Sequence, residues 1–138
     1  MRRLESAYVR LMGIRMYVDA DGRERLLLPF SQHLVGRPGF LHGGAIAGLL
    51  SLTCDQAIAR ESSHADGAAV HCATSTFQFL RAAGEKDVRA AGNVQLGRLI
   101  STVQAVAWQE MESKPIAIVT RKYRMESARH HRSGKGGR

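Results

Sequence analysis

His42 stands directly before residues 43–60, a largely apolar run that has the length and composition of a helix and begins with Gly43 and Gly44. The first N–H groups of a helix have no partner within the helix, and the helix dipole favours negative charge beside them. Such N–H groups can bind an oxyanion, for example the one that forms when a nucleophile attacks a carbonyl carbon. Two glycines before a helix are equally compatible with a tight turn that binds nothing. The segment is therefore a candidate site for oxyanion chemistry.

Other motifs with known chemistry are absent from the sequence. The His, Cys, Asp and Glu residues do not have metal-ligand spacing, so no metal site is expected. There is no G-x-S-x-G nucleophile elbow, no phosphate-binding loop and no dinucleotide fingerprint, and we expect no cofactor. Cys54 and Cys72 each lie in an apolar run, which predicts two reduced, buried thiols in a reducing compartment.

The segments before this site follow patterns of regular secondary structure. Residues 2–12 have helical periodicity that a glycine ends. Residues 14–18 and 24–30 alternate between apolar and polar side chains and are joined by an Asp-Gly turn. They predict a short helix followed by a β-hairpin, after which a loop rich in Gly and Pro leads to the candidate site.

Residues 43–60 are apolar around nearly the whole circumference of the predicted helix, which is typical of a buried helix. After it come four segments with the period-2 pattern of half-buried strands, joined by tight connections. They are residues 68–81, 87–96, 99–109 and 115–124. The order of elements predicts an α+β fold in which an antiparallel sheet is wrapped around one long, buried central helix.

Length and charge limit what else the chain contains. With 138 residues, of which 44% are hydrophobic, it has the material for one domain, which we expect over residues 1–126. The net charge is +8, but seven of the 20 Lys and Arg residues lie in residues 121–138 beside one acidic residue. We interpret residues 127–138 as a solvated, flexible basic tail and expect no nucleic-acid partner, because no basic helix or strand has interleaved aromatic residues. Since no membrane-spanning run or secretory signal is present, we expect a cytoplasmic protein without a membrane partner.

Three parts of the sequence together resemble one known family. They are residues 28–50, where LPF and GRP precede GFLHGGAIAGLL, residues 76–83, TFQFLRAA, and residues 94–98, VQLGR. In these motifs and in their joint spacing the chain resembles the hotdog-fold acyl-CoA thioesterases of the phenylacetate-pathway type. The resemblance covers roughly residues 14–125.

The resemblance implies a fold, an assembly and a substrate class. The fold is the hotdog fold, a long helix wrapped by an antiparallel sheet, and subunits pair their sheets edge to edge as homodimers or homotetramers with active sites at the dimer interface. The substrate is an acyl-CoA, so that CoA is part of the substrate and no separate cofactor is implied. Gly97 and Arg98 fall where related proteins carry a hairpin near the coenzyme, from which Arg98 would meet a phosphate of CoA. Arg98 is equally compatible with a solvent-facing turn residue.

Roles at the helix N-terminus follow from the same resemblance. The Gly43 N–H would polarise the thioester carbonyl, and His42 would hold that loop or the substrate oxygen in place. Gly44 and Phe79 would contact the substrate. Gly43 with its N–H at the helix N-terminus would then form the oxyanion hole.

The catalytic carboxylate of the family is missing from its expected place. In these enzymes an Asp or Glu stands nine residues after the His, where this chain has Ser51. Asp55 follows one helical turn later, and residues four apart share a helix face with Cβ atoms about 5–6 Å apart. Asp55 could therefore reach the pocket and act as the general base, through the Ser51 hydroxyl or a water. The alternative is that Asp55 is a structural partner of an Arg across the subunit interface.

Two functions from different classes follow. The first is hydrolysis of an acyl-CoA thioester to the free acid and CoA, with an oxyanion hole at the helix N-terminus and a carboxylate general base. The second is a non-catalytic hotdog protein that binds an acyl-CoA or related ligand, which the serine at position 51 suggests. A structural or nucleic-acid-binding role through the basic tail finds little support in the rest of the sequence.

Overall fold

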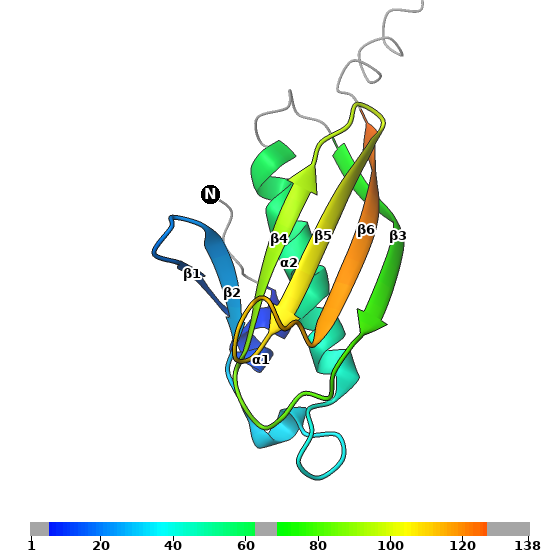
Figure 1. Cartoon of the computed structure of the whole chain (residues 1–138). Coiled ribbons are helices and arrows are strands. Elements are labelled where there is room, and N and C mark those ends of the chain that lie inside the picture. Colours follow the sequence, from blue (N-terminus) through cyan, green and yellow to red (C-terminus); the bar gives the residue numbers. More distant parts are fainter. Residues whose placement is uncertain (1–5, 63–68, 127–138) are drawn as a thin grey trace, which may run out of the picture.

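The computed structural model describes residues 6–62 and 69–126. Within these residues the chain forms two α-helices, a short 3-10 helix and a six-stranded antiparallel sheet (Figure 1). In chain order the elements are α1 (Ala7–Met12), β1 (Arg15–Val18), β2 (Glu24–Leu28), η1 (Gln32–Leu34), α2 (Gly43–Ser62), β3 (Ala69–Phe79), β4 (Val88–Gln95), β5 (Ile100–Trp108) and β6 (Ala117–Glu126). The strands lie in the order β1-β2-β4-β5-β6-β3, and α2 packs across one face of the sheet. The predicted α+β class is confirmed.

The ends of the elements lie close to the predicted ones. The strands and the long helix begin and end within two residues of the predicted positions. The first helix, predicted over residues 2–12, is described from its N-cap Ser6, whose hydroxyl accepts a hydrogen bond from Val9 N–H at 3.1 Å. It ends at Gly13, whose φ of 71° is left-handed and suits glycine. The predicted tail, residues 127–138, lies outside the described residues.

One face of α2 forms the centre of the core. Leu49, Leu50 and Cys54 are completely buried between the helix and the sheet, and burying one Leu side chain contributes roughly 1.5–3 kcal/mol. The helix approaches β4 closely because Gly92 has no side chain: a Cβ there would lie 3.3 Å from the Ala57 Cβ. This packing fixes where the N-terminus of α2 lies relative to the sheet.

The opposite face of α2 is only partly covered by the described residues. Gly44, Gly48, Ser51 and Asp55 share this face by their helical spacing, and Gly44 and Asp55 are exposed. Tyr8 of α1 covers part of it, since a Cβ built on Gly48 would overlap the Tyr8 hydroxyl. The composition of α2 predicted a helix that is buried all round. Within one chain it is not, because the sheet packs against only one side of it.

β3 is an edge strand, which determines the exposure of its side chains. It pairs with β6 on one side and stands last in the sheet, and its residues 71–76 are exposed. Cys72 is therefore exposed, and the prediction that it is buried was wrong because none of the described strands lies on the outer side of β3. Cys54 is buried as predicted, and burial raises the pKa of its thiol to about 12, so that it stays protonated at neutral pH.

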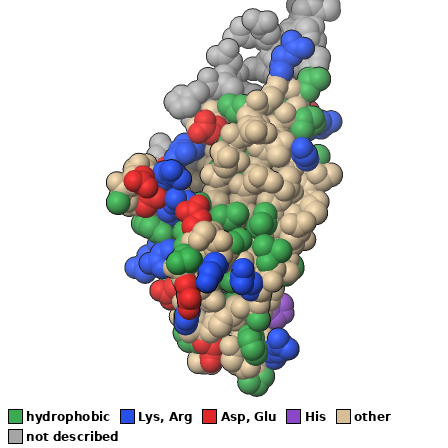
Figure 2. Space-filling model, viewed as in Figure 1, with side chains coloured by type: hydrophobic (Ala, Val, Ile, Leu, Met, Phe, Trp, Pro, Cys, Tyr) green, Lys and Arg blue, Asp and Glu red, His purple; other side chains and the backbone are tan. Residues whose placement is uncertain are grey.

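The face of the sheet away from α2 shows mostly backbone and uncharged polar side chains (Figure 2). Gln104 and Thr120, which pair across β5 and β6, are hydrogen-bonded to each other at 3.5 Å on this sheet. Charged side chains gather on the β1–β2 side of the same view. Of the helices that the described residues form, none has the length and hydropathy needed to cross a membrane.

Candidate functional site

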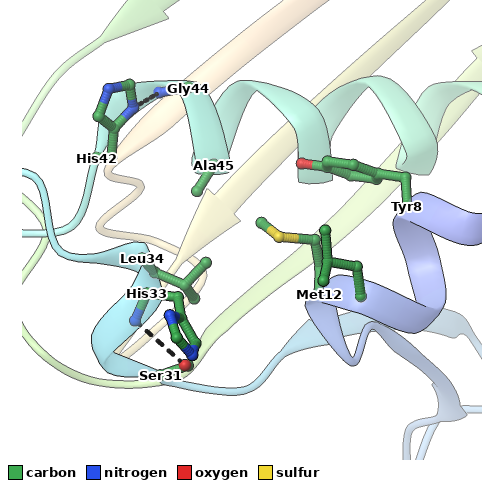
Figure 3. A pocket seen from close by; sticks show the side chains of 9 residues that line it. Tyr8, Met12, Ser31, His33, Leu34, His42, Gly44 and Ala45 are labelled. Atoms are coloured by element: carbon green, nitrogen blue, oxygen red, sulfur yellow. Dashed lines mark hydrogen bonds between the residues drawn. The ribbon is translucent and has the colours of Figure 1, made fainter.

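His42 caps α2 and leaves one backbone N–H available at its N-terminus. The Nδ1 atom of His42 accepts a hydrogen bond from Gly44 N–H at 2.8 Å (Figure 3). Gly44, which was expected to contact the substrate, thus gives its N–H to His42. Gly43 is the first residue of the helix, and no described residue accepts a hydrogen bond from its N–H. Because Nδ1 of the neutral imidazole accepts, the proton lies on Nε2, which makes His42 a second donor beside Gly43.

Backbone hydrogen bonds fix the segment that leads into α2. His42 N–H donates to the carbonyl of Leu34 at 2.6 Å, and Leu41 N–H donates to the carbonyl of Ala83 at 2.9 Å. Leu34 belongs to η1 and Ala83 follows β3, so two separate parts of the chain hold His42. The direction of the free Gly43 N–H is therefore set by the folded domain and not by the loop alone.

A cavity of about 530 Å³ lies beside this N-terminus, between α1, η1 and the start of α2 (Figure 3). Most of its lining side chains are apolar. They are Tyr8, Leu11, Met12, Ser31, His33, Leu34, His42, Gly44 and Ala45. Burial raises the pKa of the Tyr8 phenol, which therefore stays protonated at neutral pH. A cavity of this size and lining suits a small apolar group with few polar contacts.

A second cavity, of about 380 Å³, lies between residues 36–40, the start of α2 and the segment after β3. The Phe79 ring forms part of its wall and packs against Gly43, since a Cβ built on Gly43 would lie 3.6 Å from Phe79 Cε1. Arg37 and Arg81 line the same cavity. The structure thus brings Phe79 to the N-terminus of α2, and its contact with substrate stays a prediction.

Asp55 is held by groups from the sheet of its own chain. Its Oδ1 atom accepts hydrogen bonds from Arg121 Nη1 and from the Tyr123 hydroxyl, each at 2.8 Å. Arg121 also donates to the Ser75 hydroxyl at 2.8 Å and to the Ser51 carbonyl at 3.2 Å. Arg121 therefore ties α2 to β3 and β6, and it gives Asp55 an arginine partner within its own chain.

This network leaves one oxygen of Asp55 available. No described residue donates a hydrogen bond to Oδ2, and 58% of the side chain is exposed. Burial, together with the hydrogen bond to Asp55, raises the pKa of Tyr123, so the phenol stays protonated and remains a donor to Oδ1. Asp55 is consequently an anchored carboxylate with a second oxygen that can accept a proton.

Gly43 and Asp55 do not meet within one chain. They are twelve residues apart on α2, which corresponds to about 18 Å along the helix axis at the usual rise per residue. A water molecule bound to Asp55 cannot attack a carbonyl held at Gly43 of the same chain across that distance. A site that uses both residues needs a second copy of the chain.

Gly97 and Arg98 lie far from His42 in their own chain. They form the turn between β4 and β5, at the end of the sheet where α2 ends, whereas His42 begins α2 at the other end (Figure 1). Gly97 is required by the turn itself, because a Cβ there would overlap the carbonyl of Ile100 and its N–H donates to the Ser101 hydroxyl at 2.9 Å. The structure therefore does not bring Arg98 together with the other candidate residues.

The described part of the chain does not bring together side chains that could bind a metal ion. No group of three or more His, Cys, Asp or Glu side chains there is placed to hold a metal ion. His33 and His42 both line the 530 Å³ cavity, but its described lining adds no thiol and no carboxylate. The described site residues provide hydrogen-bond donors and one anchored carboxylate.

Sequence reasoning missed several residues of the site, among them Arg121 and Tyr123. Arg121 lies on the inward face of β6 between two buried side chains, Val119 and Tyr123. A charge at an inward position of an apolar strand needs a partner, so this pattern alone could have marked Arg121. Arg37 and Arg81 lie in loops, and nothing in their sequence context separates them from other surface arginines.

Comparisons with known proteins add structural relatives. No family model and no curated protein matches the sequence. The BH2602 protein of Bacillus halodurans, solved with CoA, matches with a TM-score of 0.78 at 20% identity over 92% of this chain and 83% of that chain. The conserved protein PA5202 of Pseudomonas aeruginosa has a TM-score of 0.71 at 28% identity over 88% and 95% of the two chains. The thioesterase HI1161 of Haemophilus influenzae has a TM-score of 0.73 at 21% identity over 90% and 86%.

These matches establish the fold. A thioesterase-superfamily protein and a thioesterase family protein from Silicibacter pomeroyi match with TM-scores of 0.72 and 0.73, each at 24% identity. The chain has the hotdog fold, with a six-stranded antiparallel sheet against one long helix in the described residues, as in these thioesterase structures. The resemblance noted in the sequence is confirmed at this level, and the phenylacetate-pathway type stays a prediction.

Proposed function

We propose that this protein hydrolyses acyl-CoA thioesters to the free acid and CoA. The observation that carries the proposal is the Gly43 N–H at the N-terminus of α2, left available while His42 caps the helix through Gly44. The residues on either side of Gly43, His42 and Gly44, line an apolar cavity of about 530 Å³, which suits an acyl group. The hotdog fold and a structural neighbour solved with CoA support the same substrate class.

The chemistry would run through one tetrahedral intermediate. Water attacks the thioester carbonyl carbon, a C–O bond forms, and the charge that develops on the carbonyl oxygen is stabilised by the Gly43 N–H, with His42 Nε2–H as a second donor. Asp55 takes a proton from the attacking water through Oδ2. When the intermediate collapses, the C–S bond breaks, and the proton held by Asp55 passes to the leaving thiolate of CoA. The products are the carboxylic acid and CoA thiol.

A second copy of the chain would complete this site. β3 is an unpaired edge of 11 residues, and an edge of this length favours pairing with another strand. A two-fold axis that pairs two β3 strands antiparallel also makes the two α2 helices antiparallel. The Asp55 half of one helix then lies toward the Gly43 end of the other. We propose that each active site takes Gly43 from one subunit and Asp55 from its partner.

We therefore predict that the protein is a dimer or a tetramer in solution. The open face of α2 and the free edge of β3 both lose solvent contact in such an assembly, which stabilises it. Sedimentation equilibrium at micromolar concentration should give a mass at least twice the 15.1 kDa of one chain. A species with the mass of a single chain under these conditions would contradict both the assembly and the shared site.

Release of free thiol from a panel of acyl-CoAs tests the activity itself. Short aliphatic, long aliphatic and aromatic acyl groups should be compared, since the sequence does not name the acyl group. We expect release well above the uncatalysed rate for at least one class, because the cavity beside Gly43 limits the acyl groups that fit. We place the reaction in the cytoplasm, where an exposed thiol such as Cys72 stays reduced.

The second candidate function is binding of an acyl-CoA without turnover. Two observations favour it: Ser51 occupies the position of the family carboxylate, and Asp55 is paired with Arg121. Under this alternative the wild-type protein binds CoA but releases no thiol from any acyl-CoA of the panel. The two functions are thus separated by one pair of measurements, CoA affinity and thiol release.

A further inference from the structure

Two arginines of the 380 Å³ cavity have no acidic partner in the described part of the chain. Arg37 and Arg81 form no ion pair there, and the Arg37 guanidinium lies 4.4 Å from the centroid of the Phe40 ring. None of the described residues that line this cavity is acidic. Two guanidinium groups at one cavity without a carboxylate form a site of positive potential.

The two arginines lie on segments that the fold holds next to each other. Arg37 belongs to the loop that leads to His42, and Arg81 follows the end of β3. The hydrogen bond from Leu41 N–H to the carbonyl of Ala83 joins these two segments, and Arg81 N–H donates to the carbonyl of Ile116 at 3.2 Å. Their backbones are therefore fixed, and both residues line a cavity whose wall includes Gly43.

The rest of the cavity wall is apolar and aromatic. Phe40 lies beneath the Arg37 guanidinium, and Phe79 packs against Gly43. The wall of this cavity thus includes a helix-start glycine whose N–H suits a carbonyl oxygen, two aromatic residues and two arginines. The pantetheine arm of CoA joins a thioester to a diphosphate, so one CoA molecule carries a group for the glycine and a group for the arginines.

We infer that this cavity receives the pantetheine arm of the substrate and that Arg37 and Arg81 bind the diphosphate of CoA. The inference builds on the proposed acyl-CoA substrate and extends it to the residues that recognise the coenzyme. Guanidinium groups suit phosphate because they present several N–H donors in a fixed plane and always carry charge. The acyl group then occupies the 530 Å³ cavity, and the thioester lies at His42, which lines both cavities, and at Gly43, which lines the second.

Arg23, in the turn between β1 and β2, provides a matched control for this inference. All three arginines are exposed loop or turn residues, so each replacement by alanine removes one surface charge from the same protein. Binding of CoA should be measured by titration calorimetry for Arg37→Ala, Arg81→Ala, the double variant and Arg23→Ala, at low and high salt. Each of the first two changes should weaken CoA binding about 10-fold, as expected for loss of a charge-assisted hydrogen bond. The double variant should weaken it further and flatten its salt dependence, whereas Arg23→Ala should leave it unchanged.

A substrate without phosphates separates recognition of CoA from damage to the site. Butyryl-pantetheine has the thioester and the arm but no diphosphate, so the double variant should keep its wild-type KM while its KM for butyryl-CoA rises. Unchanged CoA affinity in the double variant would overturn the inference. So would an equal loss with butyryl-pantetheine, or an equal loss of CoA affinity in Arg23→Ala. If the wild type hydrolyses neither thioester, the calorimetry still decides the inference, and only the proposed catalysis fails.

Discussion

Replacing Asp55 by Asn is expected to lower kcat about 100- to 10,000-fold, the usual cost of losing a positioned general base, and to leave CoA affinity unchanged. Asn is close to Asp in shape, and its amide oxygen can still accept from Arg121 and Tyr123, as Oδ1 does now. The ion pair with Arg121 is more than half exposed on the Asp55 side, so its loss costs at most about 1 kcal/mol of stability. The variant should therefore fold and bind but fail to activate water. Steady-state kinetics on the best acyl-CoA and CoA calorimetry measure the two quantities.

Ser51 offers the companion measurement. Ser51→Asp restores a carboxylate at the family position, one helical turn before Asp55 on the same face of α2. If the pocket is otherwise complete, kcat should rise above that of the wild type. Full activity in Asp55→Asn would show that Asp55 is not the base. An inactive wild type together with an active Ser51→Asp would replace the enzyme with the ligand-binding alternative.

The fold was readable from the sequence because its elements are defined by local patterns. The apolar run after His42, the strand alternation and the Asp-Gly turn each reflect contacts between a segment and one continuous core. The ends of the strands were predicted to within two residues for this reason. The exposure of Cys72 was not predicted, because it depends on the place of β3 in the sheet and not on the sequence pattern within β3.

The candidate site could be predicted only in part from the sequence, because its contacts join residues that are far apart in the chain. His42 and Gly43 were predicted at the start of the helix from the local sequence order, and the structure places them there, whereas the position of Phe79 beside Gly43 follows only from the fold. The pairing of Asp55 with Arg121 connects α2 to β6, and no spacing rule predicts it. Gly97 and Arg98 were placed near the coenzyme by resemblance alone, and their distance from His42 became visible only with the strand order.

Gly43→Pro is expected to lower kcat about 100- to 1,000-fold, the usual cost of removing one oxyanion-hole donor. Proline has no N–H, yet it is favoured at the first position of a helix, which is the place of Gly43. The space also allows it, because a Cβ there would be in ordinary contact with the Phe79 ring at 3.6 Å. Gly43→Ala is the matched control, since it adds a Cβ of similar position and keeps the N–H. Equal kcat values for the two variants would show that the donor does not act on the substrate.

Mixing the Gly43→Pro and Asp55→Asn subunits tests whether the two residues act across the subunit interface. In a mixed dimer with shared sites, one site carries both changes, while the other combines an intact Gly43 with an intact Asp55. Random exchange makes half of the dimers mixed, and each mixed dimer has one intact site out of two. The mixture of two nearly inactive proteins should therefore regain about a quarter of the wild-type activity. Were both residues to act within one chain, every site in the mixture would carry one of the changes, and no activity would return. Since about 18 Å along the helix axis separates Gly43 from Asp55 within one chain, we expect recovery.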